Sequence, residues 1–447
     1  MNKTIRLGAG AGFAGDRIDP AAKLASEANL DYLIFEVLGE RTIAAANSRR
    51  HSERGVGFDP LLVPRLTATL AACHASGTRI ITNGGAADPT EAGRAAVSTA
   101  QKMGLSGVRV GVVLGDDVRD NVQAVDPIVW ETGRRLSEEA SELVSANAYI
   151  GAAPVVEALD AGASVVIGGR VADPALYLAP MVHEFGWALE GSEELLGKGT
   201  LVGHLLECAG QLTGGYFADP VTKPVARLED LGFPFADVSD TGTPVFSKLQ
   251  GTGGVLDCRT ATEQMLYEVG DPARYITPDV TANFTQVKFE QVGPDTVQAT
   301  GATGSRRPDE LKVTLGFRGG WLGEGQISYA GPRATERAQH AAEIVLARLE
   351  NVHGIPSEEA CVEFIGTGAA FRGAAPSQPS SEVRLRVSAR VADRYLADCI
   401  GWEVESLYTN GPAGGGGARR SVSEVLAVRS CTIPRDAVTT RVEILEA

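Results

Sequence analysis

The segment 203–208 contains a histidine, a glutamate and a cysteine at helical spacing. In a helix, His204, Glu207 and Cys208 take positions i, i+3 and i+4, which lie on one face. A histidine that is oriented by a carboxylate can act as a general acid or base at neutral pH. We predict that His204 is the catalytic acid or base and that Glu207 orients it. A buried histidine that only bonds to its neighbour is the structural alternative.

Two adjacent glycines and an arginine follow a strand-like run at 164–167. The backbone amides of Gly168 and Gly169 can hold a developing oxyanion, and Arg170 can grip a carboxylate or phosphate through two hydrogen bonds. Asp173 comes next, at the start of a predicted helix. We predict that Arg170 binds the substrate and that Asp173 either caps this helix or serves as the second acid or base.

Polar residues occupy the position just after several predicted strands. In parallel α/β sheets the carboxyl ends of the strands meet at one edge, and ligands bind there. The residues that share this position are Asp16, Glu36, Asn83, Asp116, Asp117, Arg170 and Asp173. We predict that Asn83, with the amides of Gly84 and Gly85, binds the substrate. Asp117 is the alternative to Asp173 as the second acid or base.

Two further glycine-rich loops have cations beside them. The loop 251–254 follows Lys248, and the loop 411–417 precedes Arg419 and Arg420. Such loops present amide donors that can hold an anion, although a surface turn explains each of them equally well. The predicted substrate-binding set therefore also contains Gly253, Gly254, Gly414 and Gly415.

The patterns for common cofactors are missing from the sequence. Neither loop matches the GxxxxGK[ST] pattern of a phosphate-binding ATPase loop. The glycine run at 8–12 follows a strand, but it has the spacing GxGxG rather than the dinucleotide pattern GxGxxG. HExxH is absent as well. We therefore predict no cofactor and no bound metal.

These residues need a scaffold that brings distant loops together. The pattern of the first 180 residues predicts such a scaffold. Apolar strand-like runs, glycine loops and amphipathic helices alternate there at spacings typical of βαβ crossovers. The run 32–37 is almost entirely apolar, as expected for a strand that is buried on both faces. Strands are predicted near 5–7, 32–37, 79–82, 108–113, 148–151 and 164–167.

The pattern changes from about residue 221 onward. Alternating strands are predicted at 285–292, 311–315 and 383–387, with helices at 335–349 and 392–399. We predict an α/β fold with a largely parallel sheet and flanking helices in residues 1–220. A smaller α+β C-terminal domain in residues 221–447 completes the prediction.

Charge and hydropathy exclude several classes of protein. The 447 residues carry a formal net charge of −15, which leaves no basic face for nucleic acid. No apolar run reaches the roughly 20 residues that span a bilayer, and the N-terminus lacks a signal-peptide core. The six cysteines are scattered without a CxxC pair, which indicates free thiols. We expect a cytoplasmic homo-oligomer with no nucleic-acid or membrane partner.

Several segments together resemble the acyclic terpene utilisation (AtuA-like) family, and the likeness spans nearly the whole chain. They include Gly-Phe-Ala-Gly-Asp at 12–16, Gly-Asp-Asp at 115–117, Asn-Ala-Tyr-Ile-Gly-Ala at 147–152, Gly-Gly-Arg-Val-Ala-Asp at 168–173 and Gly-His-Leu-Leu-Glu-Cys at 203–208. The resemblance implies a bacterial catabolic protein for branched acyclic terpenoids. Their breakdown proceeds through acyl-CoA intermediates and a biotin-dependent carboxylase.

Two functions of different class follow. We predict an enzyme that acts on a branched acyl-CoA or related carboxylate by acid–base chemistry of the hydratase or lyase type, with the CoA thioester as substrate rather than cofactor. The alternative is a non-catalytic ligand-binding or accessory subunit of an acyl-CoA carboxylase complex. A metal-dependent hydrolase is a third hypothesis.

Overall fold

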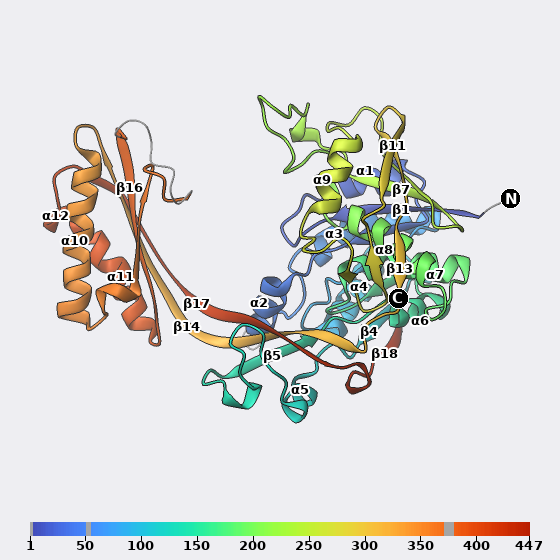
Figure 1. The fold of residues 1–447 in the computed structure, drawn as a ribbon, viewed down its shortest axis with the longest axis horizontal. Helices are drawn as coiled ribbons and strands as arrows, with labels where there is room; N and C mark the ends of the chain where they lie inside the picture. Colours follow the sequence, from blue (N-terminus) through green and yellow to red (C-terminus); the bar gives the residue numbers. More distant parts are fainter. Residues whose placement is uncertain (1–2, 51–54, 371–379) are drawn as a thin grey trace. The chain divides into compact units, whose positions relative to one another are not determined.

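The computed structural model describes residues 3–50, 55–370 and 380–447, which form two compact units (Figure 1). Unit 1 comprises Met1–Glu139, Val144–Gly316 and Val428–Ala447, and unit 2 comprises Ala140–Leu143 and Phe317–Ala427. The domain boundary predicted at residue 220 does not coincide with this division. The reason is that the strands at 234–239, 244–248, 288–293 and 296–300 extend the N-terminal sheet by antiparallel pairing.

Unit 1 is built on a ten-stranded mixed sheet, so the prediction of an α/β fold is confirmed. The parallel strands at its centre are β1 (Thr4–Ala11), β2 (Tyr32–Phe35), β3 (Arg79–Thr82), β6 (Val165–Ile167) and β4 (Arg109–Leu114), in this order. Antiparallel strands extend both edges. They are β7 (Pro234–Ser239), β8 (Pro244–Lys248), β12 (Thr296–Thr300) and β11 (Lys288–Gly293) beyond β1, and β18 (Arg441–Glu446) beyond β4.

Helices pack on this sheet, and four of them have a proline at their first or second position. Proline stands in the first turn of α1, α4, α6 and α7, where its missing N–H removes no helical hydrogen bond. The helices against the sheet are α1 (Asp19–Glu27), α3 (Leu62–Ser76), α4 (Pro89–Lys102), α6 (Ala153–Asp160), α7 (Asp173–Phe185) and α8 (Glu193–Glu207). Shorter helices in the connections are α2 (Glu40–Arg50), α5 (Arg119–Val125) and α9 (Cys258–Leu266).

A small antiparallel sheet packs against α8. It consists of β9 (Tyr275–Ile276), β10 (Thr281–Asn283) and β13 (Thr303–Ser305). The strand predicted at 148–151 is displaced, because the strand of this region is β5 (Leu143–Ala148). Beyond it the chain turns around Asp279, whose carboxylate accepts the N–H of Ala152 at 3.0 Å.

Unit 2 is an α+β arrangement with helices packed on a sheet of β15 (Ala360–Ile365), β16 (Glu382–Val391), β14 (Glu310–Ala330) and β17 (Gly415–Pro434). Figure 1 shows β14 and β17 as two long strands side by side, and both contribute residues to each unit. The core lies between this sheet and the helices α10 (Ala334–His353), α11 (Arg394–Glu405) and α12 (Leu407–Asn410). In the described part of the chain, none of the helices has both the length and the apolar character needed to cross a bilayer.

Glycines let α8 approach its neighbours at backbone distance. A Cβ atom at Gly203 would lie 2.6 Å from the carbonyl oxygen of Pro174 and 2.7 Å from its Cα, in the first turn of α7. Nearer the start of α8, a Cβ at Gly197 would lie 2.3 Å from the carbonyl oxygen of Thr303. Since α8 ends with His204 and Glu207, this close packing sets the position of both side chains.

Replacing Gly203 with alanine is therefore expected to destabilise unit 1 by about 1–3 kcal/mol, because backbone atoms cannot move aside as a flexible side chain can. Thermal unfolding followed by circular dichroism measures this. Gly270→Ala is the matched control, because a Cβ there meets nothing within 4 Å. Equal melting temperatures for the two variants would contradict the proposed packing constraint.

Candidate active site

Unit 1 contains a cavity of about 650 Å³, which we call the carboxyl cavity. The loops that follow β1, β2, β5 and β6 line it, together with the end of α8. The position just after a strand is thus where polar side chains meet. The polar lining residues that matter for chemistry are Glu36, Glu40, Tyr149, Arg170, Asp173 and Glu207.

Glu36 lies one residue beyond β2 and is 8 % exposed. Its Oε1 accepts hydrogen bonds from Asn83 Nδ2 and from the backbone N–H of Leu38, both at 2.9 Å. Burial disfavours the charged carboxylate, and the negative charge of Asp173 adds to this effect. Together they raise the pKa of Glu36 to about 8, although Asn83, Leu38 and Arg170 oppose the shift. At neutral pH Glu36 therefore holds a proton.

Glu207 presents the second carboxyl group to the same cavity. Its Oε1 lies 2.8 Å from His204 Nδ1, while its Oε2 is buried and has no hydrogen-bond partner among the described residues. Burial raises the pKa of Glu207 to about 7. The charged groups that act on it are His204, which lowers the pKa, and Asp173 and Glu268, which raise it. Glu207 can therefore exchange a proton near neutral pH.

His204 lies behind Glu207 and does not line the cavity. The imidazole is 1 % exposed, and ring centroids of Tyr275 and Phe284 lie 5.0 and 5.9 Å from its own. Its Nε2 is 3.0 Å from the carbonyl oxygen of Met265, and because a carbonyl only accepts, Nε2 carries a hydrogen. Burial opposes the imidazolium, yet Glu207 and the bond to Met265 raise the pKa of His204 above its usual value.

His204 and Glu207 are therefore in contact, as the sequence predicts, but the residue that faces the cavity is Glu207 and not His204. The sequence predicts that His204 faces the substrate and that Glu207 orients it, whereas the structure places Glu207 at the cavity and His204 in support. Both ring nitrogens of His204 are bonded to protein groups, which leaves the free oxygen of Glu207 as the atom that can reach a ligand.

Arg170 lines the cavity beside Glu36, but its terminal nitrogens are bonded to protein. The side chain is 1 % exposed, with Nη1 2.8 Å from Asp173 Oδ1 and also bonded to the carbonyl oxygen of Leu38. Nη2 donates to the hydroxyl of Tyr149, over whose ring the guanidinium lies at 3.9 Å. Arg170 thus holds the cavity wall together, while its Nε has no hydrogen-bond partner among the described residues. The grip on a substrate carboxylate stays a prediction.

The chain from residue 5 to residue 444 matches the model of the family described as acyclic terpene utilisation family protein AtuA. The chain belongs to this family. Comparisons with curated proteins and with solved structures find no significant match to either. Membership of the AtuA family supports a role in acyclic terpene utilisation, and the reaction has to be argued from the site.

The strand-end glycines of this AtuA family member serve the scaffold. Gly84 N–H donates to Thr82 Oγ1, Gly85 N–H to the carbonyl of Gly168, and Gly168 N–H to the carbonyl of Thr82, at 2.9–3.0 Å. A Cβ at Gly169 would lie 2.4 Å from the carboxylate of Asp116. The predicted oxyanion role of these amides is therefore not supported, since three of them are bonded within the protein and none of the four residues lines the cavity. Asn83 contributes by holding Glu36.

The remaining predicted residues are not among those that line the carboxyl cavity. Asp117 is exposed and accepts the N–H of Arg119 at 3.3 Å. Gly253 and Gly254 donate their N–H groups to the carbonyls of Asp230 and Ala226 at 2.7 and 2.9 Å. Gly414 and Gly415 belong to unit 2, whereas every residue that lines the cavity belongs to unit 1.

The sequence places Glu36 at the strand-end edge but gives it no role in the site, because its burial is not visible in the sequence. Glu40, which also lines the cavity, was not predicted. Glu40 accepts hydrogen bonds from the hydroxyl of Tyr149 and from Lys312 Nζ, the latter at 3.0 Å. Although burial opposes it, attraction to Arg170 and these bonds lower the pKa of Glu40 to about 2, so that Glu40 stays ionised.

Cys208 lines the cavity without the properties of a nucleophile. Burial raises the pKa of its thiol far above the usual value, so the reactive thiolate is not formed at neutral pH. Among the residues that the structure describes, no group of three or more His, Cys, Asp or Glu side chains is arranged to hold a metal ion. The chemistry that the cavity offers is proton transfer by carboxyl groups.

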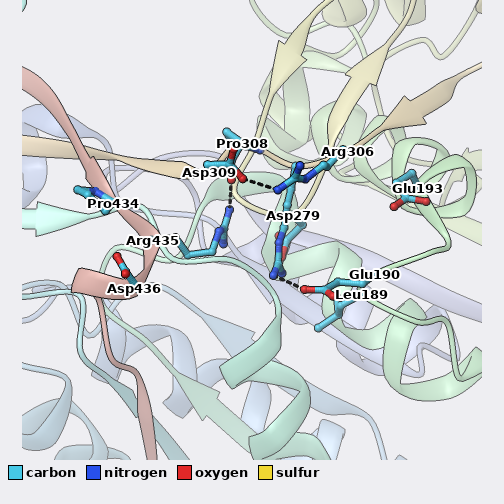
Figure 2. A pocket seen from close by; sticks show the side chains of 11 residues that line it. Leu189, Glu190, Glu193, Asp279, Arg306, Pro308, Asp309, Pro434, Arg435 and Asp436 are labelled. Carbon is cyan, nitrogen blue, oxygen red and sulfur yellow. Dashed lines mark hydrogen bonds and ion pairs between the residues drawn. The ribbon is translucent and has the colours of Figure 1, made fainter.

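A second cavity of unit 1 has a volume of about 700 Å³, and Arg306, Arg307 and Arg435 are among the residues that line it. Figure 2 shows this cavity, with Arg306 beside Asp309 and Arg435 labelled. Its ions are largely paired with each other. Arg306 bonds to Asp309 at 2.7 Å and Arg307 to Glu190, while Arg435 Nη2 donates to two backbone carbonyls. This is the pattern of a structural ion-pair cluster, and the carboxyl cavity is the better candidate for an active site.

The raised pKa of Glu36 predicts how stability depends on pH. Because the folded state holds a proton that the unfolded state releases above pH of about 4.5, stability falls as pH rises from about 4.5 to about 8. Glu36→Gln stays neutral, so its melting temperature is expected to fall less over this range. At the alkaline end its free energy of unfolding is expected to exceed that of the wild type by up to roughly 5 kcal/mol. Glu263→Gln, at an exposed ion pair with Lys223, is expected to follow the wild type. Parallel curves for all three proteins would show that Glu36 ionises normally.

Proposed function

We propose that this AtuA family member adds water to, or removes water from, a branched acyl-CoA or related carboxylate by acid–base catalysis. The observation that carries the proposal is the presence of two buried carboxyl groups, Glu36 and Glu207, at one cavity with pKa values of about 8 and about 7. A catalytic acid or base works best when its pKa lies near the operating pH. At neutral pH one group then holds a proton while a large share of the other is ionised.

The two roles follow from these protonation states. In the direction of water addition, Glu207 takes a proton from a water molecule. The oxygen of this water molecule bonds at the same time to the β-carbon of an enoyl substrate. Glu36 gives its proton to the α-carbon, which completes the addition of water across the double bond. Glu207 ends protonated and Glu36 ionised, and exchange with solvent restores both. The reverse sequence removes water from the β-hydroxyacyl compound.

His204 supports this exchange as a positioning residue. Its Nε2–H is fixed on the carbonyl of Met265, which turns Nδ1 toward Glu207 at 2.8 Å. A proton taken up by Glu207 can pass to this nitrogen. Arg170 and Asn83 hold the other half of the site, since Asn83 bonds to Glu36 and Arg170 bonds to Asp173.

The test is the pH dependence of enoyl-thioester hydration, followed by the loss of enoyl absorbance. We expect a bell-shaped profile, in which kcat rises as Glu207 ionises near pH of about 7 and falls as Glu36 loses its proton near pH of about 8. A flat profile would contradict the assigned pair. If the pure protein is inactive with every thioester but copurifies with carboxylase subunits, the accessory-subunit function replaces the proposed one.

A further inference from the structure

The ionisable side chains that line the carboxyl cavity are mostly acidic. Among the described residues, the carboxyl groups that line it are those of Asp16, Glu36, Glu40, Asp173, Glu207 and Glu268. The cavity lining contains two guanidinium groups, those of Arg17 and Arg170. Arg170 is buried beside Glu36, and its terminal nitrogens are bonded to protein groups. Arg17, the other, donates to the carbonyl of Leu228 at 2.7 Å.

The excess of acidic groups over basic groups disfavours a negatively charged ligand. A carboxylate that entered between Glu36 and Glu207 would meet the negative charges of Glu40 and Asp173, and that of Glu207 when it is ionised. Burial of Glu36 and Glu207 reduces the screening of these charges by water. The ligand carboxylate would also hold both carboxyls protonated, so that neither could act as a base. An uncharged acyl group, such as an ester or thioester, meets no such repulsion.

Glu207 can accept a hydrogen bond from a ligand. Its Oε2 is buried without a partner among the described residues, and the glutamate as a whole is 6 % exposed. An unsatisfied buried oxygen is costly, whereas a hydrogen bond to a charged group is worth roughly tenfold or more in affinity. The donor that fits the reaction is a hydroxyl group.

Three aromatic side chains line the same cavity. Two of them are exposed, and the third packs against one of these two. Phe13 is 59 % exposed and Tyr216 is 85 % exposed, and the Tyr216 ring meets that of Tyr267 edge-on at 6.2 Å. Exposed apolar groups gathered at a cavity mark a binding surface. An aliphatic chain would cover these rings while its polar end reaches Glu207.

We propose that the carboxyl cavity binds an aliphatic acyl ester or thioester that carries a hydroxyl group on its β-carbon, and that it rejects the corresponding free acid. The inference rests on the proposed function, because the β-hydroxyl is the group that the addition of water creates. It narrows the substrate from two classes, thioester and carboxylate, to the uncharged one.

The experiment compares three matched ligands by isothermal titration calorimetry with the full chain. They are the N-acetylcysteamine thioester of β-hydroxyoctanoic acid, the free β-hydroxy acid, and the octanoyl thioester without the hydroxyl. At about pH 8 we expect the first to bind at least about tenfold more tightly than either of the others. At about pH 5.5, where Glu36 and Glu207 are neutral, the discrimination against the free acid is expected to shrink several-fold.

Two variants make the test specific. Glu207→Leu is expected to lose the preference for the hydroxyl. Glu263→Gln changes a residue that does not line the cavity, so it is expected to retain both preferences. Equal or tighter binding of the free acid, or no binding of the hydroxy thioester at millimolar concentration, would overturn the inference. Hydration activity together with a preference for the acid would reject only this inference. Tight binding of the thioester without any turnover would instead reject the proposed function.

Discussion

Replacing Glu207 with glutamine is expected to lower kcat for enoyl-thioester hydration about a thousandfold while the protein stays folded. Glutamine cannot take a proton from water, and loss of a general base typically costs two to four orders of magnitude in rate, roughly 10²–10⁴-fold. The amide keeps the size of the side chain and can donate to His204 Nδ1, which now lies 2.8 Å from Glu207 Oε1. The kinetic constants and the melting temperature, measured on the same sample, check the prediction.

Glu36→Gln and Glu263→Gln complete this experiment. Glu36→Gln is expected to be as impaired as Glu207→Gln, because the proton donor is then lost, whereas the exposed Glu263 contributes nothing to the site. His204→Asn is expected to reduce kcat less and to move the acidic limb of the pH profile, as a positioning residue should. A Glu207→Gln enzyme with more than about a tenth of the wild-type rate would remove Glu207 from the catalytic role.

Replacing Arg170 with methionine is expected to destabilise unit 1 by about 3–5 kcal/mol. The guanidinium is 1 % exposed and is the partner of Asp173, of the Tyr149 hydroxyl and of the Leu38 carbonyl. Methionine fills part of the volume but leaves these polar groups without their donor. Urea unfolding followed by circular dichroism measures the loss.

Two comparisons separate this effect from a general loss of charge. Arg170→Lys is expected to recover part of the stability, because one ammonium group keeps the charge but cannot reach all the partners of the fork. Arg94→Ala removes an arginine whose ion pair with Glu91 is more than half exposed at both ends, so it is expected to cost less than about 1 kcal/mol. A similar cost for Arg94→Ala and Arg170→Met would contradict the structural role assigned to Arg170.

The local elements were predictable because their signals are local. The strand at 79–82 matches β3 (Arg79–Thr82), and the helix predicted at 335–349 lies within α10 (Ala334–His353). The rule that polar residues after parallel strands share one edge also places Glu36, Arg170 and Asp173 at one cavity. The antiparallel edges of the sheet were missed, since β7 pairs with β1 although the two strands are more than 200 residues apart in the chain.

The amino-acid sequence by itself determined the helices and strands of the centre of the sheet, the strand-end position of the polar residues and the pairing of His204 with Glu207 on one helix face. Only the tertiary structure decided which member of that pair meets the cavity and whether Arg170 is free. The reason is that these outcomes depend on partners distant in the chain. His204 is held by a carbonyl 61 residues away, and Arg170 by one 132 residues away. Spacing along the chain fixes which side chains share a face, but burial and hydrogen bonds from remote segments fix what each of them can do.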